Sequence, residues 1–170
     1  MKEIYLAGGC YWGVEKYIAS LRGVTATEVG FANGHVTAPA YVEVKHGDTG
    51  HAETVRVTYD ETVIPLPSLL RLFLRIIDPT SVNHQGEDVG PQYRTGIYWT
   101  DETDEPTVRA ILADLEKTLG QPLAVEAQPL QCFYPAEEYH QKYLDKNPGG
   151  YCHVPWAEIQ WAKEIDPKDY

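Results

Sequence analysis

One cysteine near the start of the chain has the setting of a reactive thiol. Cys10 lies in the run Gly8–Gly13, which joins a short apolar segment to an amphipathic one, so we expect it at the N-terminus of a helix. Unpaired N–H groups and the positive end of the helix dipole favour a thiolate there. The same residue could instead be a small buried core residue. The flanking Tyr11 and Trp12 and the loop setting favour a nucleophile.

A carboxyl group that could supply a proton lies further along the chain. Glu53 follows Thr49–Ala52 and precedes Thr54–Tyr59, where polar and apolar residues alternate with the period of two that is typical of a half-buried strand. Because Glu53 shares the parity of the apolar residues, a strand that reaches back to it directs its carboxyl toward the core. Burial raises the pKa of a carboxyl group, which makes Glu53 a candidate proton donor near neutral pH. If the strand begins only at Thr54, Glu53 faces solvent instead.

A polar stretch in the second half of the chain offers further candidate ligands. Asn83–Asp88 and Gln92–Arg94 contain amide, carboxyl, imidazole, phenol and guanidinium groups. Such a stretch is typical of a functional loop, and it is also typical of an ordinary surface connection.

The composition limits the class of protein. The 170 residues, 43% hydrophobic and 23% charged, fit one globular domain spanning residues 1–170. The net charge of −11 argues against nucleic acid and membrane surfaces as partners. We expect a cytoplasmic protein, because the sequence shows neither a secretory leader nor an apolar stretch long enough to span a bilayer. Three cysteines are an odd number, which does not suit a static disulfide framework.

Hydrophobic periodicity predicts the elements that must position these residues. Four strands are expected at residues 2–7, 24–31, 55–59 and 96–99, with helices at residues 14–21 and 67–77. The resulting order, β-α-β-β-α-β, is that of a split β-α-β unit. We therefore predict an α+β fold, a two-layer sandwich with a ferredoxin-like core, in which two helices cover one face of a mainly antiparallel sheet.

Extra C-terminal helices and a loop-like tail are expected beyond this core. A third helix should span residues 104–119 and stop at Gly120. A fourth should begin at Pro135 and carry Tyr143 and Leu144. From about residue 147, where Asn-Pro-Gly-Gly follows, the tail is expected to be mostly loop.

Taken together, these segments resemble the methionine sulfoxide reductase A family, and the resemblance runs from the first strand to Cys152. The segments that carry it are Gly9–Gly13, Gly30–Gly34, Thr49–Glu53, Asp78–Thr80, Gln85–Asp88, Gln92–Arg94 and Ala136–Gln141. The departures are mild. Tyr11 stands where Phe is usual, Phe31 where Tyr is usual, Glu87 where Asn is usual and Pro91 where Thr is usual. Tyr11 adds a hydroxyl to the expected methyl pocket, which bears on substrate affinity rather than on reaction type.

The resemblance implies an activity and the residues that perform it. The family reduces the S epimer of methionine sulfoxide, free or in proteins, through a cysteine that matches Cys10 and becomes a sulfenic acid as methionine leaves. The sulfoxide oxygen is a poor leaving group until it is protonated, so the reaction also needs proton donors. Glu53 matches the family's acid, and Tyr41 and Tyr93 match hydroxyls that hydrogen-bond the oxygen.

The resemblance also implies how substrate is held and how the enzyme is reset. Asp88 matches a carboxylate that helps organise the site, while Tyr11 and Trp12 match the pocket for the S-methyl group. The family commonly places a recycling cysteine in the tail, which matches Cys152 in a glycine-containing segment that we expect to be mobile. The implied cycle closes with a Cys10–Cys152 disulfide reduced by thioredoxin or a dithiol. No bound cofactor is implied, and a monomer is expected.

Two other interpretations of the cysteines remain. A thiol hydrolase would pair Cys10 with a downstream histidine such as His140. A structural zinc module would use Cys10, Cys132, Cys152 and a histidine, although the sequence has no Cys-x-x-Cys pair. Outside such a module, Cys132 matches no catalytic position of the family and is expected to be packed and inert.

Overall fold

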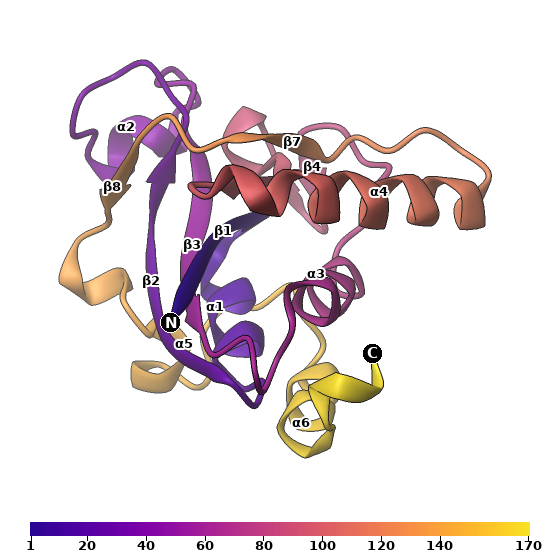
Figure 1. Ribbon diagram of the computed structural model, residues 1–170. Coiled ribbons are helices and arrows are strands. Elements are labelled where there is room, and N and C mark those ends of the chain that lie inside the picture. Colours follow the sequence, from indigo (N-terminus) through magenta and orange to yellow (C-terminus); the bar gives the residue numbers. More distant parts are fainter.

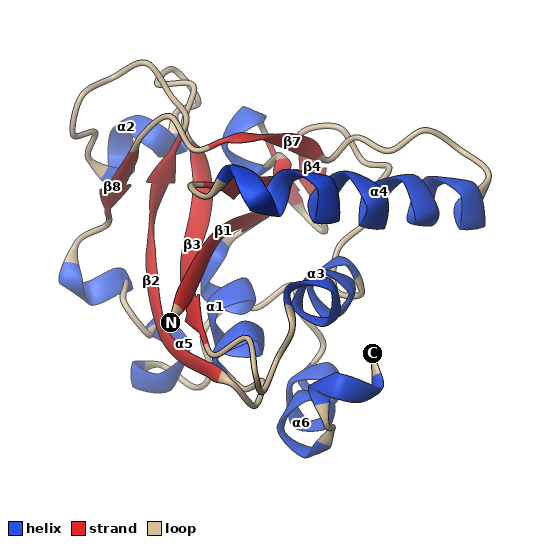
Figure 2. Ribbon diagram, viewed as in Figure 1, coloured by secondary structure: helices blue, strands red, loops and turns tan.

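A six-stranded mixed sheet forms the centre of the protein (Figures 1 and 2). The computed structural model describes residues 1–170. The strand order is β7-β6-β1-β3-β2-β8, and the strands are β1 (Lys2–Gly8), β2 (Val24–Ala32), β3 (Ala52–Tyr59), β6 (Thr95–Trp99), β7 (Glu126–Pro129) and β8 (Phe133–Pro135). Neighbouring strands are antiparallel except β6 and β7, which are parallel. The fold is of the mixed α+β class that the sequence predicts.

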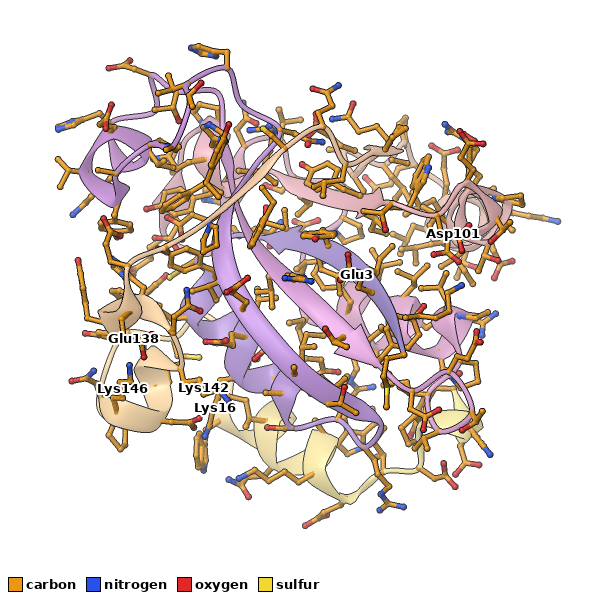
Figure 3. All side chains as sticks on the ribbon, turned by 60° about the vertical axis from the view of Figure 1, so that its left-hand side comes forward. Glu3, Lys16, Asp101, Glu138, Lys142 and Lys146 are labelled. Atoms are coloured by element: carbon orange, nitrogen blue, oxygen red, sulfur yellow. The ribbon has the colours of Figure 1, made fainter.

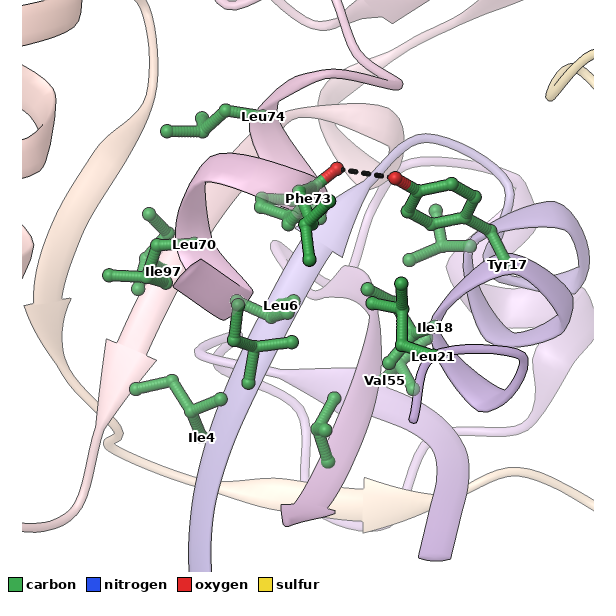
Figure 4. Close-up of a cluster of buried hydrophobic side chains, with 14 of the residues drawn as sticks. Ile4, Leu6, Tyr17, Ile18, Leu21, Val55, Leu70, Phe73, Leu74 and Ile97 are labelled. Atoms are coloured by element: carbon green, nitrogen blue, oxygen red, sulfur yellow. Dashed lines mark hydrogen bonds between the residues drawn. The ribbon is translucent and has the colours of Figure 1, made fainter. Parts of the chain in front are cut away.

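Two helices pack on one face of the sheet and enclose the main core. They are α1 (Tyr11–Ala19) and α3 (Leu66–Leu74), and Figure 4 shows their side chains meeting those of Ile4, Leu6 and Val55 from the sheet. The Tyr17 hydroxyl of α1 donates to the Leu72 carbonyl of α3 at 2.9 Å. This bond joins the two helices where both are buried.

A longer helix extends the helical layer. It is α4 (Glu105–Leu119), which packs against α3 and ends at Gly120 in a left-handed conformation with φ of 69°. This end matches the prediction, because glycine takes a positive φ without strain. No helix, including the 15-residue α4, is long and apolar enough to cross a bilayer.

The predicted fourth helix is wrong. Pro135 ends β8, and a 3-10 helix (Glu138–His140) and the short helix α5 (Tyr143–Lys146) follow. The Gln141 side chain accepts a hydrogen bond from the backbone N–H of Val29 and donates to its carbonyl, at 2.8 and 2.9 Å. Lys142 then has a φ of 52°, which no continuous helix allows.

Two lysine side chains fix the short helix α5 in place. The Lys146 ammonium donates to the Glu138 carbonyl at 2.9 Å, and Asp145 pairs with Lys16 of α1. Figure 3 shows Lys146 and Glu138 side by side on this flank, with Lys16 nearby. The segment that follows β8 is thus tied to β2 by Gln141 and to α1 by an ion pair.

The loop-like tail is also wrong as a prediction. The helix α6 (Trp156–Glu164) and a 3-10 helix (Pro167–Asp169) lie beyond residue 147. Only Ile159 and Ala162 of α6 are buried, so its apolar stripe is too narrow to detect in the sequence. The tail is fixed by α3 instead, since Arg75 pairs with Glu158 at 2.7 Å and lies 3.9 Å above the Trp161 ring.

Candidate active site

A glycine turn places Cys10 at the start of α1. Gly9 has a φ of 88°, and a Cβ built on it would lie 2.7 Å from the Gln85 Cβ, so only glycine fits. Cys10 follows as the N-cap residue of α1. Its side chain is buried, with the residue 7% exposed. The turn from β1 into α1 therefore aims a buried thiol at the first turn of the helix.

Glu53 lies beneath this same turn. β3 begins at Ala52, so the alternative in which Glu53 faces solvent is wrong, and the residue is 2% exposed. Its Oε1 accepts a hydrogen bond from the Tyr11 backbone N–H at 3.2 Å. Its Oε2 is buried and has no hydrogen-bond partner in the protein. One carboxyl oxygen is therefore fixed by α1 and the other is free to carry a proton.

The surroundings of Glu53 keep it protonated near neutral pH. Burial raises its pKa to about 8, against the lowering effect of the Tyr11 N–H, while the Asp88 charge raises it further and Lys45 lowers it. Desolvation disfavours the charged form of a carboxyl group. The structure thus produces the raised pKa that the strand parity predicts.

The expected low thiol pKa is not found. Burial raises the pKa of Cys10 well above its ordinary value, and the Glu53 carboxylate and Asp88 raise it further, against the lowering contribution of the Trp12 backbone N–H. The N-terminal position on α1 is outweighed because the side chain is removed from water between two acidic groups. Burial therefore favours the thiol form of Cys10 over the thiolate in the free protein.

Two phenol groups stand near the acid. Tyr41 begins the short helix α2 (Tyr41–Lys45), and Tyr93 ends a 3-10 helix (Pro91–Tyr93). The Gln92 side chain donates to the Lys45 carbonyl at 2.9 Å and ties these two segments together. Burial and then the Glu53 charge raise the pKa of both phenols, so both hydroxyls remain hydrogen-bond donors.

An aromatic stack holds Trp12. Its indole N–H donates to His140 Nδ1 at 3.2 Å, and its ring lies parallel to that of Tyr143 with centroids 3.8 Å apart. Burial lowers the pKa of His140, so the neutral ring accepts from Trp12. Sequence analysis assigned Tyr143 only to a helix, because the contact joins residues 131 positions apart and leaves no local pattern.

The thiol hydrolase interpretation has no support in this geometry. His140 Nδ1 is already engaged by Trp12, and His140 Nε2 faces Glu137 at 4.0 Å. No hydrogen bond joins Cys10 to a histidine. The geometry does not support the zinc interpretation either, because no group of three or more His, Cys, Asp or Glu side chains is arranged to hold a metal ion.

The two remaining cysteines differ in their surroundings. Cys132 precedes β8, where its N–H donates to the Asn33 side chain at 3.3 Å and its thiol to the Gly34 carbonyl at 3.7 Å, so ordered neighbours hold it as expected. Cys152 packs on α1, since a Cβ built on Gly13 would lie 3.1 Å from its sulfur. The Cys152 segment, for which the sequence predicts mobility, is joined to the body of the protein by hydrogen bonds of the two residues beside Cys152.

Comparison with known proteins gives a consistent family. The family model described as peptide methionine sulfoxide reductase matches residues 2–168. The peptide methionine sulfoxide reductase MsrA of Lachnoclostridium phytofermentans is 54% identical over 162 residues, which cover 95% of this chain and 98% of that protein.

Solved structures of a yeast protein are also similar. Mxr1 from Saccharomyces cerevisiae in reduced form superposes with a TM-score of 0.85 at 40% identity over 91% of both chains. Mxr1 in complex with Trx2 gives a TM-score of 0.60 at 26% identity over 84% of both chains. At these identities and scores the likeness extends beyond a local motif to the whole fold.

Removing the hydroxyl of Tyr11 should stabilise the protein. Tyr11 is 1% exposed and its hydroxyl is buried without a hydrogen-bond partner, which costs about 1–3 kcal/mol for an unpaired polar group. We expect Tyr11→Phe to raise the free energy of unfolding by about 1 kcal/mol in denaturant titration. The matched control is Tyr17→Phe, which removes a bonded hydroxyl and should lower it. Equal losses in the two variants would show that the Tyr11 hydroxyl is satisfied.

Proposed function

We propose that this chain, which belongs to the peptide methionine sulfoxide reductase family, is a thiol-dependent oxidoreductase that reduces methionine-(S)-sulfoxide, free or in oxidised proteins, to methionine. The observation that carries the proposal is the buried Glu53 carboxyl fixed beneath Cys10, with one oxygen bound to the Tyr11 N–H and the other unpartnered. A nucleophilic sulfur and a proton donor thus meet at one turn. Its cellular role is the repair of oxidised methionine.

The first step transfers oxygen from the substrate to Cys10. The Cys10 thiol and the sulfoxide are converted into a sulfenic acid and a thioether, so oxygen and hydrogen balance without another reactant. Glu53 donates a proton to the sulfoxide oxygen as the Cys10 sulfur attacks, which turns that oxygen into a better leaving group. The proton of the thiol restores the neutral carboxyl group at the end of the step.

The neighbouring residues bind and orient the sulfoxide. Tyr41 and Tyr93 donate hydrogen bonds to its oxygen, for which their raised pKa values keep them protonated. Trp12, held by its stack on Tyr143, packs with Tyr11 against the S-methyl group. Asp88 helps to organise the site from the hairpin of β4 (His84–Gln85) and β5 (Asp88–Val89).

Resetting the enzyme consumes a second thiol. Cys152 attacks the Cys10 sulfenic acid, which forms a disulfide and releases water. A dithiol then reduces this bond, and thioredoxin is the physiological reductant. The solved complex of yeast Mxr1 with Trx2 supports this partner. The cycle as proposed uses no bound cofactor.

The finer description of the fold belongs to the same proposal. The four central strands lie in the order β6-β1-β3-β2 with antiparallel neighbours, which supports a ferredoxin-like split β-α-β core in a single domain of residues 1–170. We further propose that the protein is a monomer. We also place the protein in the cytoplasm, where thioredoxin keeps thiols reduced.

The two sulfoxide epimers provide the test of function. We expect the purified protein to reduce the S epimer of methionine sulfoxide with thioredoxin or dithiothreitol and to leave the R epimer unchanged. Cys10→Ser should abolish the reaction, because a hydroxyl at its ordinary pKa is a far weaker nucleophile. Methionine release is measured by chromatography. Turnover of the R epimer alone would contradict the assignment.

Glu53→Gln should separate proton donation from binding. The amide keeps the shape but supplies no acid, so we expect methionine release to slow by about 10²-fold or more. The protonated carboxyl persists below its pKa of about 8, so wild-type release should decline above that pH, and the Glu53→Gln rate should not. Glu15→Gln makes the same change at another buried carboxyl and should retain the decline. A near-normal rate in Glu53→Gln would remove Glu53 from the reaction.

The two other cysteines should give opposite results. Cys152→Ser should still release one methionine per enzyme but lose thioredoxin-driven turnover, with some turnover left in a small dithiol. Cys132→Ser should behave like the wild type, because its thiol bonds only to the Gly34 carbonyl. Single-turnover release and thioredoxin-coupled rates measure both. If the two phenotypes are exchanged, Cys132 is the resolving thiol.

A further inference from the structure

Two hydrogen bonds anchor the residues on either side of Cys152. The Tyr151 hydroxyl donates to Asp88 Oδ2 at 3.0 Å, and His153 Nε2 bonds to the Gly8 carbonyl at 3.0 Å. A carbonyl oxygen only accepts, so His153 Nε2 carries the hydrogen. The segment Tyr151–His153 is therefore tied at one end to the β4–β5 hairpin and at the other to the last residue of β1.

Glycines let this segment lie directly on the site. A Cβ built on Gly13 would lie 3.1 Å from the Cys152 sulfur and 3.3 Å from His153 Nδ1, and a Cβ on Gly86 would lie 3.4 Å from the His153 Cβ. Gly13 follows Cys10, the N-cap residue of α1, by three residues. The Cys152 sulfur therefore packs on the first turns of α1, three residues along the chain from Cys10.

We infer that Tyr151 and His153 are positioning residues for the resolving step, which hold the Cys152 thiol beside Cys10 so that it meets the sulfenic acid as soon as this forms. This inference deepens the proposed function and rests on it. In the step, the sulfur of Cys152 bonds to that of Cys10, the bond from Cys10 sulfur to its oxygen breaks, and the hydroxyl leaves as water with the thiol proton.

We expect the two anchors to act on the second step. Tyr151 and His153 flank Cys152 in the chain, and neither hydrogen bond involves Glu53, Tyr41 or Tyr93, although that of Tyr151 ends on Asp88. Holding a reactant close raises its effective concentration, so loss of an anchor lowers the frequency with which Cys152 reaches Cys10. Methionine release, which precedes this step, does not require it.

The test separates the two steps in a single turnover. Reduced enzyme is mixed with methionine-(S)-sulfoxide, and methionine, free thiols and sulfenic acid trapped by a 1,3-dione are followed in time. For Tyr151→Phe we expect an unchanged rate of methionine release, disulfide formation slowed by about tenfold, as for one lost charge-assisted hydrogen bond, and more trapped sulfenic acid. Tyr139→Phe is the control, because Tyr139 is 58% exposed and its hydroxyl has no bonded partner.

His153 is tested with a pair of variants. His153→Leu removes the donor to the Gly8 carbonyl and should also slow disulfide formation, whereas His153→Gln retains an N–H donor and should recover part of the rate. An unchanged disulfide rate in Tyr151→Phe and in the Tyr151→Phe, His153→Leu double variant would overturn the inference. A parallel loss of methionine release would overturn it too, because the anchors would then serve the first step.

A second oxidant of Cys10 distinguishes a failure of this inference from a failure of the proposed function. Hydrogen peroxide oxidises the Cys10 thiol to the sulfenic acid and is itself reduced to water, so disulfide formation can be followed without a sulfoxide. If the wild type releases no methionine from either epimer, the proposed function fails. If peroxide-triggered disulfide formation is as fast in Tyr151→Phe as in the wild type, the positioning role fails.

Discussion

The burial of the Glu53 carboxyl beneath the first turn of α1 is the constraint on which the site depends. Its position requires β3 to reach back to Ala52, and β2 to pair with it so that Phe31 lies opposite Glu53. The Tyr11 N–H, one of the unpaired donors of α1, then fixes one carboxyl oxygen. A shift of one residue in this strand would turn Glu53 to the opposite face, so sheet register and site geometry are determined together.

A neutral pair of reactants is the resting state that this burial produces. Desolvation keeps the Glu53 carboxyl protonated, and burial raises the pKa of the Cys10 thiol well above its ordinary value. Two anions side by side in a buried site would be costly. In the proposed reaction, Glu53 gives its proton to the sulfoxide oxygen and becomes a buried carboxylate. The proton released by the Cys10 thiol then neutralises that carboxylate. Proton transfer and sulfur attack are therefore coupled by the same desolvation.

The parts of the site that depend on local pattern are predictable from the sequence, and those that depend on distant partners are not. The parity of Glu53 and the glycine turn before Cys10 follow from short-range rules. The break after β8 depends on Gln141 pairing with Val29, 112 residues away, and it leaves no periodic signal. The position of the Cys152 segment likewise depends on a hydrogen bond between His153 and Gly8, which are 145 residues apart. The glycines in the segment, taken alone, predict a mobile loop.

In the proposed cycle, this anchoring explains how a thiol of unfavourable pKa can serve as the second nucleophile. Burial raises the pKa of Cys152 above its ordinary value, so only a small fraction is thiolate at neutral pH, which slows an attack on the sulfenic acid. Proximity compensates, because a fixed neighbour has an effective concentration far above that of any thiol in solution. Cys10 is almost fully buried, whereas Cys152 is only partly so. The proposed disulfide would therefore transfer the oxidised centre from a buried sulfur to a partly exposed one, which an external dithiol reaches more readily.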